Sequence, residues 1–221
     1  SDKDFDYLDS NKKEFVKTVL PIIINENQNI LMIRSFVSEL KGKLETFKTL
    51  NNNEIRKLND IAKKYNIKYH NKHKLDLVDE ILSNIDIIPN SIVLAQAAIE
   101  SGWGKSRFAK EYNALFGEYT YDNSKGVIPL ERENGDTHLI KAFSSYSNSV
   151  ESYFDNINSH NAYEDFRDIR NIMRERNNFS NVNLLVNKLS TYAEDENYIN
   201  TIRQVIETNN FSIFDQKTIT Y

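Results

Sequence analysis

The chain is organised around the stretch SIVLAQAAIE, residues 91–100, which is followed at once by the glycine-containing run SGWG, residues 101–104. Apart from Gln96 and Glu100, every residue after Ser91 in this stretch is apolar. A helix that is apolar on every side is buried all round. Ser91 is the expected N-cap, because its hydroxyl can accept from a first-turn backbone N–H. The sequence therefore predicts a central buried helix that ends at Glu100.

Helical periodicity also dominates the part of the chain before this helix. From residue 12 to about residue 48, apolar residues recur at three- and four-residue steps, as on a helix with one buried face. Pro21 removes a backbone donor within that pattern, so we expect a kink or break just before it. A second helix should start near residues 51–54, where cap-forming residues precede a new apolar pattern. A third periodic segment runs from about Lys74 to Ile85.

The segment from Gly117 to Phe143 has a different character. Glycine and proline punctuate short runs, and the pair Asn134-Gly135 is the strongest local signal for a hairpin. We expect antiparallel strands near Gly126–Arg132 and Thr137–Phe143. This segment is the predicted β-lobe, at about residues 117–143.

Helical periodicity resumes after Ser147 and continues to about Asn209, with breaks near residues 177–180 and 194–196. The predicted fold class is therefore mainly α (α+β), a helical protein with a small antiparallel β-hairpin lobe.

Composition excludes several classes of protein. The chain has 221 residues, no cysteine and a formal net charge of -4, so a disulfide-stapled domain, a thiolate nucleophile and a nucleic-acid-binding stripe are all disfavoured. No apolar run reaches the roughly 18 to 20 residues that span a bilayer, and the first residues do not resemble a signal peptide. Either the protein is cytosolic, or an export signal or anchor has been removed.

Glu100 is the residue whose predicted surroundings are best suited to acid catalysis. Burying a charged carboxylate at the end of an apolar helix is costly. Burial therefore usually raises the pKa of the group, so that it is protonated and uncharged. A carboxyl group that stays protonated near neutral pH is what a glycosidase needs as its general acid. The alternative is that Glu100 faces solvent or pairs with Lys105 or Arg107, and spacing alone does not choose between these interpretations.

The sequence around Glu100 also resembles that of a known protein family. The run from Leu94 to Ala109, followed by Asn113-Ala114-Leu115-Phe116-Gly117, resembles the signature of bacterial peptidoglycan N-acetylglucosaminidases. The combination of Ala-x-x-Glu-Ser-x-Trp-Gly with Asn-x-Leu-Phe-Gly thirteen residues after the Glu is specific. This resemblance implies a lysozyme-like fold, and cleavage of the β-1,4 bond on the reducing side of N-acetylglucosamine, between it and N-acetylmuramic acid.

The resemblance covers nearly the whole chain and is greatest toward the Bax-like branch. Residues 126–129, 137–138, 143–153 and 158–163 match that branch in order, and the segment Leu189–Tyr198 is similar to the family's Tyr-Ala-x-Asp-x-x-Tyr piece. The expected organisation is an N-terminal helical region, residues 1–85, packing on a catalytic domain, residues 86–221.

The resemblance implies catalytic roles for three residues. Glu100 would donate a proton to the leaving glycosidic oxygen, and the positive charge that develops on the sugar would need an anionic or dipolar partner. Glu131 stands at the place of the second carboxylate of some family members, and Glu133 shares its strand face. If the substrate's own N-acetyl group assists the reaction, neither of these two carboxylates is needed. Tyr192 matches a tyrosine expected to face the reacting sugar, although it can equally be a packing residue.

Aromatic and polar residues around this signature are expected to bind substrate. Trp103 and Phe116 could contact sugar rings or, equally, serve as core residues, and Asn113 is expected to cap or buttress the site. Glycines 102, 104 and 117 are interpreted as backbone requirements. The full predicted substrate-binding set is Trp103, Asn113, Phe116, Tyr119, Tyr121 and Tyr146.

Metal and serine-hydrolase chemistry are disfavoured. His70, His73, His138 and His160 have no His-x-x-x-His spacing with acidic partners, and no Gly-x-Ser-x-Gly elbow occurs. We therefore predict no metal and no cofactor.

The predicted protein is an endo-β-N-acetylglucosaminidase of the bacterial cell envelope, acting as a monomer on peptidoglycan glycan strands and not on nucleic acid. Two alternatives remain: a lytic transglycosylase, and a non-catalytic glycan-binding or scaffolding module on the same fold.

Overall fold

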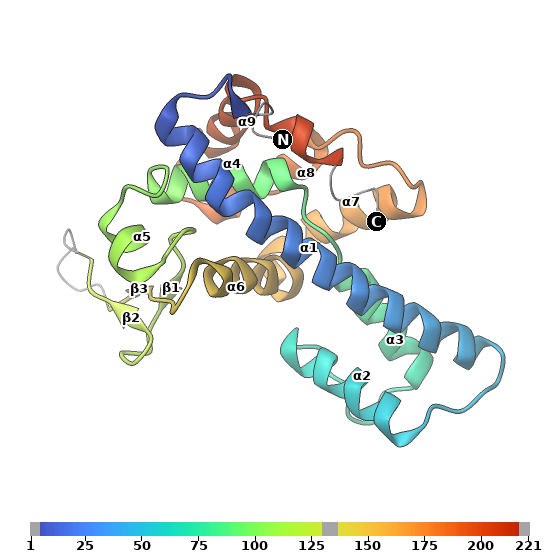
Figure 1. The fold of residues 1–221 in the computed structure, drawn as a ribbon. Coiled ribbons are helices and arrows are strands. Elements are labelled where there is room, and N and C mark those ends of the chain that lie inside the picture. The colour runs from blue at the N-terminus through green and yellow to red at the C-terminus, as the bar shows by residue number, and fades with distance from the viewer. Residues whose placement is uncertain (1–4, 130–136, 217–221) are drawn as a thin grey trace. The chain divides into compact units, whose positions relative to one another are not determined.

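The computed structural model describes residues 5–129 and 137–216. They form a mainly helical protein with one small sheet, which confirms the predicted mainly α (α+β) class (Figure 1). The helices are α1 (Ser10–Glu45), α2 (Asn52–Lys64), α3 (Lys74–Asn84), α4 (Asn90–Ser101), α5 (Arg107–Tyr112), α6 (Tyr146–Ser159), α7 (Glu164–Glu175), α8 (Asn183–Val186) and α9 (Tyr198–Thr208), with 3-10 turns η2 (Asn161–Tyr163), η3 (Ser190–Tyr192) and η4 (Phe211–Phe214). The strands are β1 (Tyr119–Thr120), β2 (Gly126–Val127) and β3 (Leu139–Lys141).

The chain divides into two compact units, each built from segments on both sides of Asp86. The units therefore do not follow the predicted boundary between residues 1–85 and 86–221, and the assignment of the catalytic role to residues 86–221 stays a prediction. Unit 1 comprises Ser1–Glu26, Pro89–Tyr153 and Thr201–Tyr221, and unit 2 comprises Asn27–Ile88 and Phe154–Asn200.

Helix α4 is the core of unit 1, as its apolar sequence predicts. Every residue from Asn90 to Ala98 is buried. The polar Gln96 is fully buried and accepts a hydrogen bond from the hydroxyl of Tyr153. A buried polar group that is satisfied in this way avoids most of the cost of leaving water, so Gln96 is compatible with the core.

The start of α4 corrects the predicted N-cap. Pro89, not Ser91, occupies the N-cap position and offers no side-chain hydrogen bond. Asp215 caps the helix instead, because its carboxylate accepts hydrogen bonds from Ser91 N at 2.8 Å and from Ser91 Oγ at 2.7 Å. Carboxylates at a helix N-terminus satisfy unpaired N–H groups and complement the helix dipole. The partner lies 124 residues away in sequence, so local spacing could not predict it.

A kink or break was predicted just before Pro21; the break is wrong, because α1 continues through this residue, and the kink stays a prediction. Val16, Val19, Leu20 and Ile23 are exposed by 2% or less. Burial of each such side chain stabilises by about 1.5–3 kcal/mol, which together exceeds the roughly 3 kcal/mol that an internal proline costs a helix.

The sheet of unit 1 has three antiparallel strands in the order β1-β3-β2, which lie together in Figure 1. Gly126 pairs with Lys141, and Val127 with Ile140, so the predicted pairing of the two strand regions is confirmed where both are described. Strand β1, which pairs with β3 at Tyr119 and Ile140, was not predicted. With two residues it is too short for the alternation that identifies strands.

In unit 2, the predicted start of the second helix near residues 51–54 is confirmed. The Asn51 side chain accepts from Glu54 N, and the Glu54 side chain accepts from Asn51 N, forming a capping box at the start of α2. Helices α2 and α3 lie side by side (Figure 1).

The buried ionic centre of unit 2 is Asp86, which is fully buried. Its carboxylate accepts two hydrogen bonds from Arg174, at 2.6 and 2.8 Å, and Nε of Arg34 lies 3.5 Å from Oδ1. The fully buried Arg170 donates to the carbonyl of Asp86 at 3.0 Å and to Oδ1 of Asn158 at 2.7 Å. The cluster joins the end of α3 to α6 and α7.

Within the described ranges, no helix combines the length and the apolar character that crossing a bilayer requires.

Candidate active site

Glu100 stands at the open end of α4, in the last turn before the helix stops. It is half-buried, whereas residues 90–98 are buried. A Cβ placed on Gly117 would lie 3.0 Å from Oε2 of Glu100, so the carboxylate rests against the Gly117 backbone. The carboxyl group is thus held by a packed helix on one side and a turn on the other, with part of its surface accessible to a ligand.

The backbone after Glu100 is unusual. Gly102, Trp103 and Gly104 have φ values of 56, 58 and 75°. For a residue with a Cβ the left-handed region costs roughly 1–2 kcal/mol, so Trp103 is strained while the two glycines are not. Ser101 Oγ accepts from Gly104 N at 2.9 Å and holds this turn. Strain of this kind concentrates at functional sites.

One face of α6 supports the turn that carries Gly117. Ser149 Oγ accepts from Leu115 N at 3.1 Å, and the Tyr153 ring stacks on that of Phe116 with centroids 4.2 Å apart. Residues 149 and 153 are one helical turn apart and therefore point to the same side. These contacts give a structural reason for the Ser-Val-x-Ser-Tyr motif at residues 149–153.

A further carboxylate in this turn, Glu118, was not predicted from the sequence. Ser152 Oγ donates to Oε2 of Glu118 at 2.7 Å, and Lys141 Nζ donates to Ser152 Oγ at 2.8 Å. Burial raises the pKa of Glu118, opposed by the Ser152 hydrogen bond and the Lys141 charge. Its position directly after the Asn-x-Leu-Phe-Gly motif was the available signal, but the contacts require β3 and α6.

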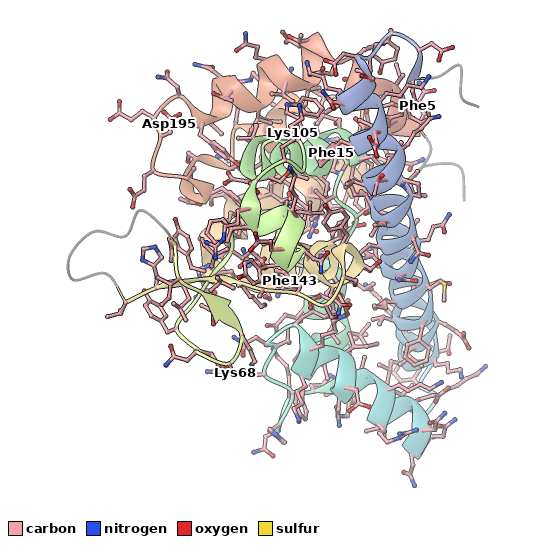
Figure 2. The ribbon with its side chains drawn as sticks, turned by 60° about the vertical axis from the view of Figure 1, so that its left-hand side comes forward. Phe5, Phe15, Lys68, Lys105, Phe143 and Asp195 are labelled. Carbon is pink, nitrogen blue, oxygen red and sulfur yellow. The ribbon has the colours of Figure 1, made fainter. Side chains whose placement is uncertain are left out.

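Two of the predicted substrate-binding aromatics have packing roles. Phe116 is 1% exposed, so its ring lies in the core and is not available to a sugar. Trp103 is half-buried and packs edge-on against Phe15, labelled in Figure 2, at 5.7 Å between centroids, and against Phe211 at 6.0 Å. Lys12 lies over the same indole at 4.9 Å. The core alternative therefore holds for Phe116, and a sugar contact by Trp103 stays a prediction.

The other predicted binding residues of unit 1 differ in exposure. Asn113 is the left-handed C-cap of α5, and its amide donates to the Phe143 carbonyl at 3.0 Å, as expected for a capping residue. Tyr119 and Tyr121 are 65% and 77% exposed. Tyr146 is half-buried at the start of α6. The three tyrosines have accessible surface, and their contact with a sugar stays a prediction.

The structure does not test the remaining two predicted catalytic residues against Glu100. Glu131, like Glu133, lies outside the described residues. Tyr192 belongs to unit 2, in η3, where its ring stacks parallel to that of Tyr198 at 5.9 Å and lies 6.2 Å from Tyr163. Its role toward a sugar stays a prediction.

Across residues 5–129 and 137–216, no group of three or more histidine, aspartate or glutamate side chains is arranged to hold a metal ion.

The contact between Gly117 and Glu100 leads to a test. On the prediction that Glu100 is the general acid, Gly117→Ala is expected to lower the rate of peptidoglycan cleavage by roughly tenfold or more, because the new methyl group would displace the carboxylate and small misplacements of catalytic groups are costly. Gly102→Ala is the matched control: φ is also positive, but no atom lies within 4 Å of its Cβ position. Thermal unfolding should shift similarly in both variants. Equal rates of cleavage in the two variants would contradict the prediction that the contact of Gly117 with Glu100 positions the carboxylate.

The chain belongs to the glucosaminidase family. The family model described as mannosyl-glycoprotein endo-beta-N-acetylglucosaminidase matches residues 75–211. Among similar proteins, the protein Bax of Escherichia coli (strain K12) is 32% identical over 184 residues, or 82% of this chain and 63% of Bax. The peptidoglycan hydrolase FlgJ of the same strain is 37% identical over 92 residues, or 37% of this chain and 29% of FlgJ.

The chain thus spans less than two thirds of the length of these two relatives. Among solved structures, the catalytic domain of the autolysin Auto from Listeria monocytogenes aligns with a TM-score of 0.45 at 18% identity, covering 86% of this chain and 97% of that domain.

Proposed function

We propose that this protein is a peptidoglycan hydrolase that cleaves the β-1,4 bond between N-acetylglucosamine and N-acetylmuramic acid, with Glu100 as the general acid. The single observation that carries the proposal is the position of Glu100. It is half-buried at the end of α4, against Gly117, and within the segment that matches the glucosaminidase family. The name of FlgJ, a peptidoglycan hydrolase, supports the choice of polymer. The proposed location is the bacterial cell envelope, and the proposed state is a monomer.

In the proposed mechanism, Glu100 protonates the leaving oxygen as the bond to the anomeric carbon stretches. General-acid catalysis of this kind contributes roughly 10²–10⁴ in rate. The cation that develops on the sugar is stabilised by the substrate's N-acetyl group or by a second carboxylate, for which Glu131 is the proposed residue and Glu133 the alternative. Tyr192 is proposed to orient the N-acetyl group or a water molecule. Since Glu131 and Tyr192 assist rather than donate the proton, their loss should cost less than that of Glu100.

The identity of the products tests this proposal. Purified peptidoglycan is digested, reduced with borohydride and analysed by mass spectrometry. We expect products that end in reduced N-acetylglucosamine. Products that end in reduced N-acetylmuramic acid would refute the proposed bond, anhydro-muropeptides would indicate a lytic transglycosylase, and a lack of products together with retained glycan binding would indicate a scaffolding module.

A further inference from the structure

Basic residues are concentrated in one short segment of this acidic chain. Residues 56–74 carry seven of its 28 lysines and arginines, two of its four histidines and only one of its 32 acidic residues. The segment covers most of α2, the loop that follows it and the first residue of α3. The net charge of -4 therefore conceals a strongly basic region, and this region belongs to unit 2.

A surface pocket of about 340 Å³ lies inside this basic segment. Lys63 and Lys68, both exposed, are its two basic lining residues of fixed positive charge. Lys68 lies in the loop between α2 and α3 and is labelled in Figure 2. The pocket is lined by Lys63, Asn66, Ile67, Lys68, Tyr69 and His70.

The charges of the pocket are not neutralised by the neighbouring protein. Lys64 pairs with Asp155 at 3.6 Å, and Lys72 pairs with Glu80. By contrast, neither Lys63 nor Lys68 forms an ion pair with any carboxylate in the part of the chain that the structure describes. Lys63 also complements the dipole at the C-terminal end of α2, but Lys68 lies four residues beyond that helix. Two ammonium groups at one pocket are thus available to an external anion.

The pocket also has an aromatic wall. The rings of Tyr69 and His70 lie 4.2 Å apart with an angle of 35° between their planes. Asn66, in the left-handed region with a φ of 56°, adds a polar residue to the lining of the same pocket. An aromatic surface with a few convergent polar groups is the usual composition of a small-ligand site. Together with two ammonium groups it favours a ligand that combines a flat or apolar part with an anionic group.

We infer that this pocket is a docking site for the carboxylate groups that the stem peptides of peptidoglycan carry beside the sugar rings. The choice of polymer rests on the proposed function, whereas the preference for an anion rests on Lys63 and Lys68. The site gives an overall acidic protein a local positive surface on which an anionic polymer can bind. Because exposed ion pairs are each weak, such a site retains the polymer through several modest contacts.

The test is a co-sedimentation assay of the full chain with purified peptidoglycan sacculi, in a Glu100→Gln background so that the polymer is not cut. Lys63→Gln/Lys68→Gln is expected to weaken binding by about five- to tenfold at low salt, since two ion pairs of up to about 1 kcal/mol each are lost. High salt should abolish the difference by screening. Lys48→Gln/Lys188→Gln is the matched control, because it removes the same charge from unit 2 and neither lysine has an ion pair within the described ranges. It should bind like the parent.

Two treatments of the sacculi identify the anion. Amidation of their carboxylates should reduce binding of the parent to the level of Lys63→Gln/Lys68→Gln, whereas removal of attached phosphate polymers with hydrofluoric acid should leave it unchanged. Unchanged binding by the double variant, with an unchanged melting temperature, would overturn the inference. So would binding that is insensitive to amidation, or that is lost after removal of phosphate polymers.

This assay separates the docking site from the proposed function, because binding is measured without cleavage. If the chain with Glu100 intact releases no reducing ends but binding still depends on Lys63 and Lys68, the proposed function fails and the docking site stands. If cleavage proceeds while the double variant binds as well as the parent, the docking site fails and the proposed function stands.

Discussion

Replacing Glu100 by glutamine is expected to lower the rate of peptidoglycan hydrolysis by about a thousandfold, within the range that loss of a general acid produces. Glutamine preserves the shape of the side chain and its place against Gly117, but it has no proton to give to the leaving oxygen. Folding should be nearly unaffected, because Glu100 is half-buried and lies in the last turn of a helix whose packing rests on other residues.

The measurement is the rate of release of reducing ends, with circular dichroism as the check on folding. Glu111→Gln serves as the control, since it makes the same chemical change in α5 of the same unit, at a side chain that is 56% exposed and pairs with Arg107. It should retain activity within about twofold, as expected for a surface ion pair. More than a tenth of the parent activity in Glu100→Gln would exclude Glu100 as the general acid.

Replacing Asp86 by asparagine should destabilise unit 2 by about 3–5 kcal/mol, the cost of removing one partner from a buried ion pair. The carboxylate is fully buried and is the anion that faces Arg34, Arg170 and Arg174. Without it, three positive charges remain close together, of which Arg170 is fully buried and the side chain of Arg34 is only 16% exposed. Whole domains are stable by only about 5–15 kcal/mol, so the midpoint of urea or thermal unfolding should fall sharply.

Asp79→Asn is the control for this prediction, because Asp79 also pairs with a cation of unit 2 but is 51% exposed, with Lys41 Nζ at 2.8 Å. That surface pair should contribute less than about 1 kcal/mol. Equal unfolding midpoints for Asp79→Asn and Asp86→Asn would contradict the proposed role of the cluster.

The loss of stability caused by Asp86→Asn should depend on pH in a direction set by the pKa of Asp86. Burial alone would raise the pKa of Asp86, but the hydrogen bond from Arg174 and the charges of Arg170, Arg34 and Arg174 together hold the pKa below its ordinary value. The contribution of Asp86 to stability is therefore fully present above the unfolded pKa of about 3.9 and is lost as the pH falls through the lower folded value. The difference between parent and Asp86→Asn should shrink on acidification below about pH 4.

The parts of the fold that sequence predicted well are those determined by local interactions. The cap-forming residues at 51–54 identified the start of α2, and the apolar run before Glu100 identified the buried helix. Both signals lie within a few residues of the structure they specify. At Pro21 the local signal for a break was misleading. Helix α1 continues there, because the burial of the apolar residues around Pro21 outweighs the local cost of proline.

The parts that could not be predicted depend on partners distant in sequence. The cap of α4 comes from Asp215, and the charge of Asp86 is balanced by Arg174, 88 residues later. The support of Glu118 comes from Ser152, 34 residues away. Nothing in the local pattern distinguishes these side chains from ordinary surface charges. Glu100 itself could be proposed from sequence because the residues that surround it, from Ala97 to Gly117, are near it in the chain.

The most direct test of the central claim is digestion of peptidoglycan in water enriched with heavy oxygen, followed by mass spectrometry of the products. Hydrolysis next to N-acetylglucosamine predicts one heavy oxygen atom at each new N-acetylglucosamine reducing end, and about a thousandfold slower formation of this product by Glu100→Gln. Unlabelled anhydro products, or labelled products formed equally by Glu100→Gln, would contradict the account.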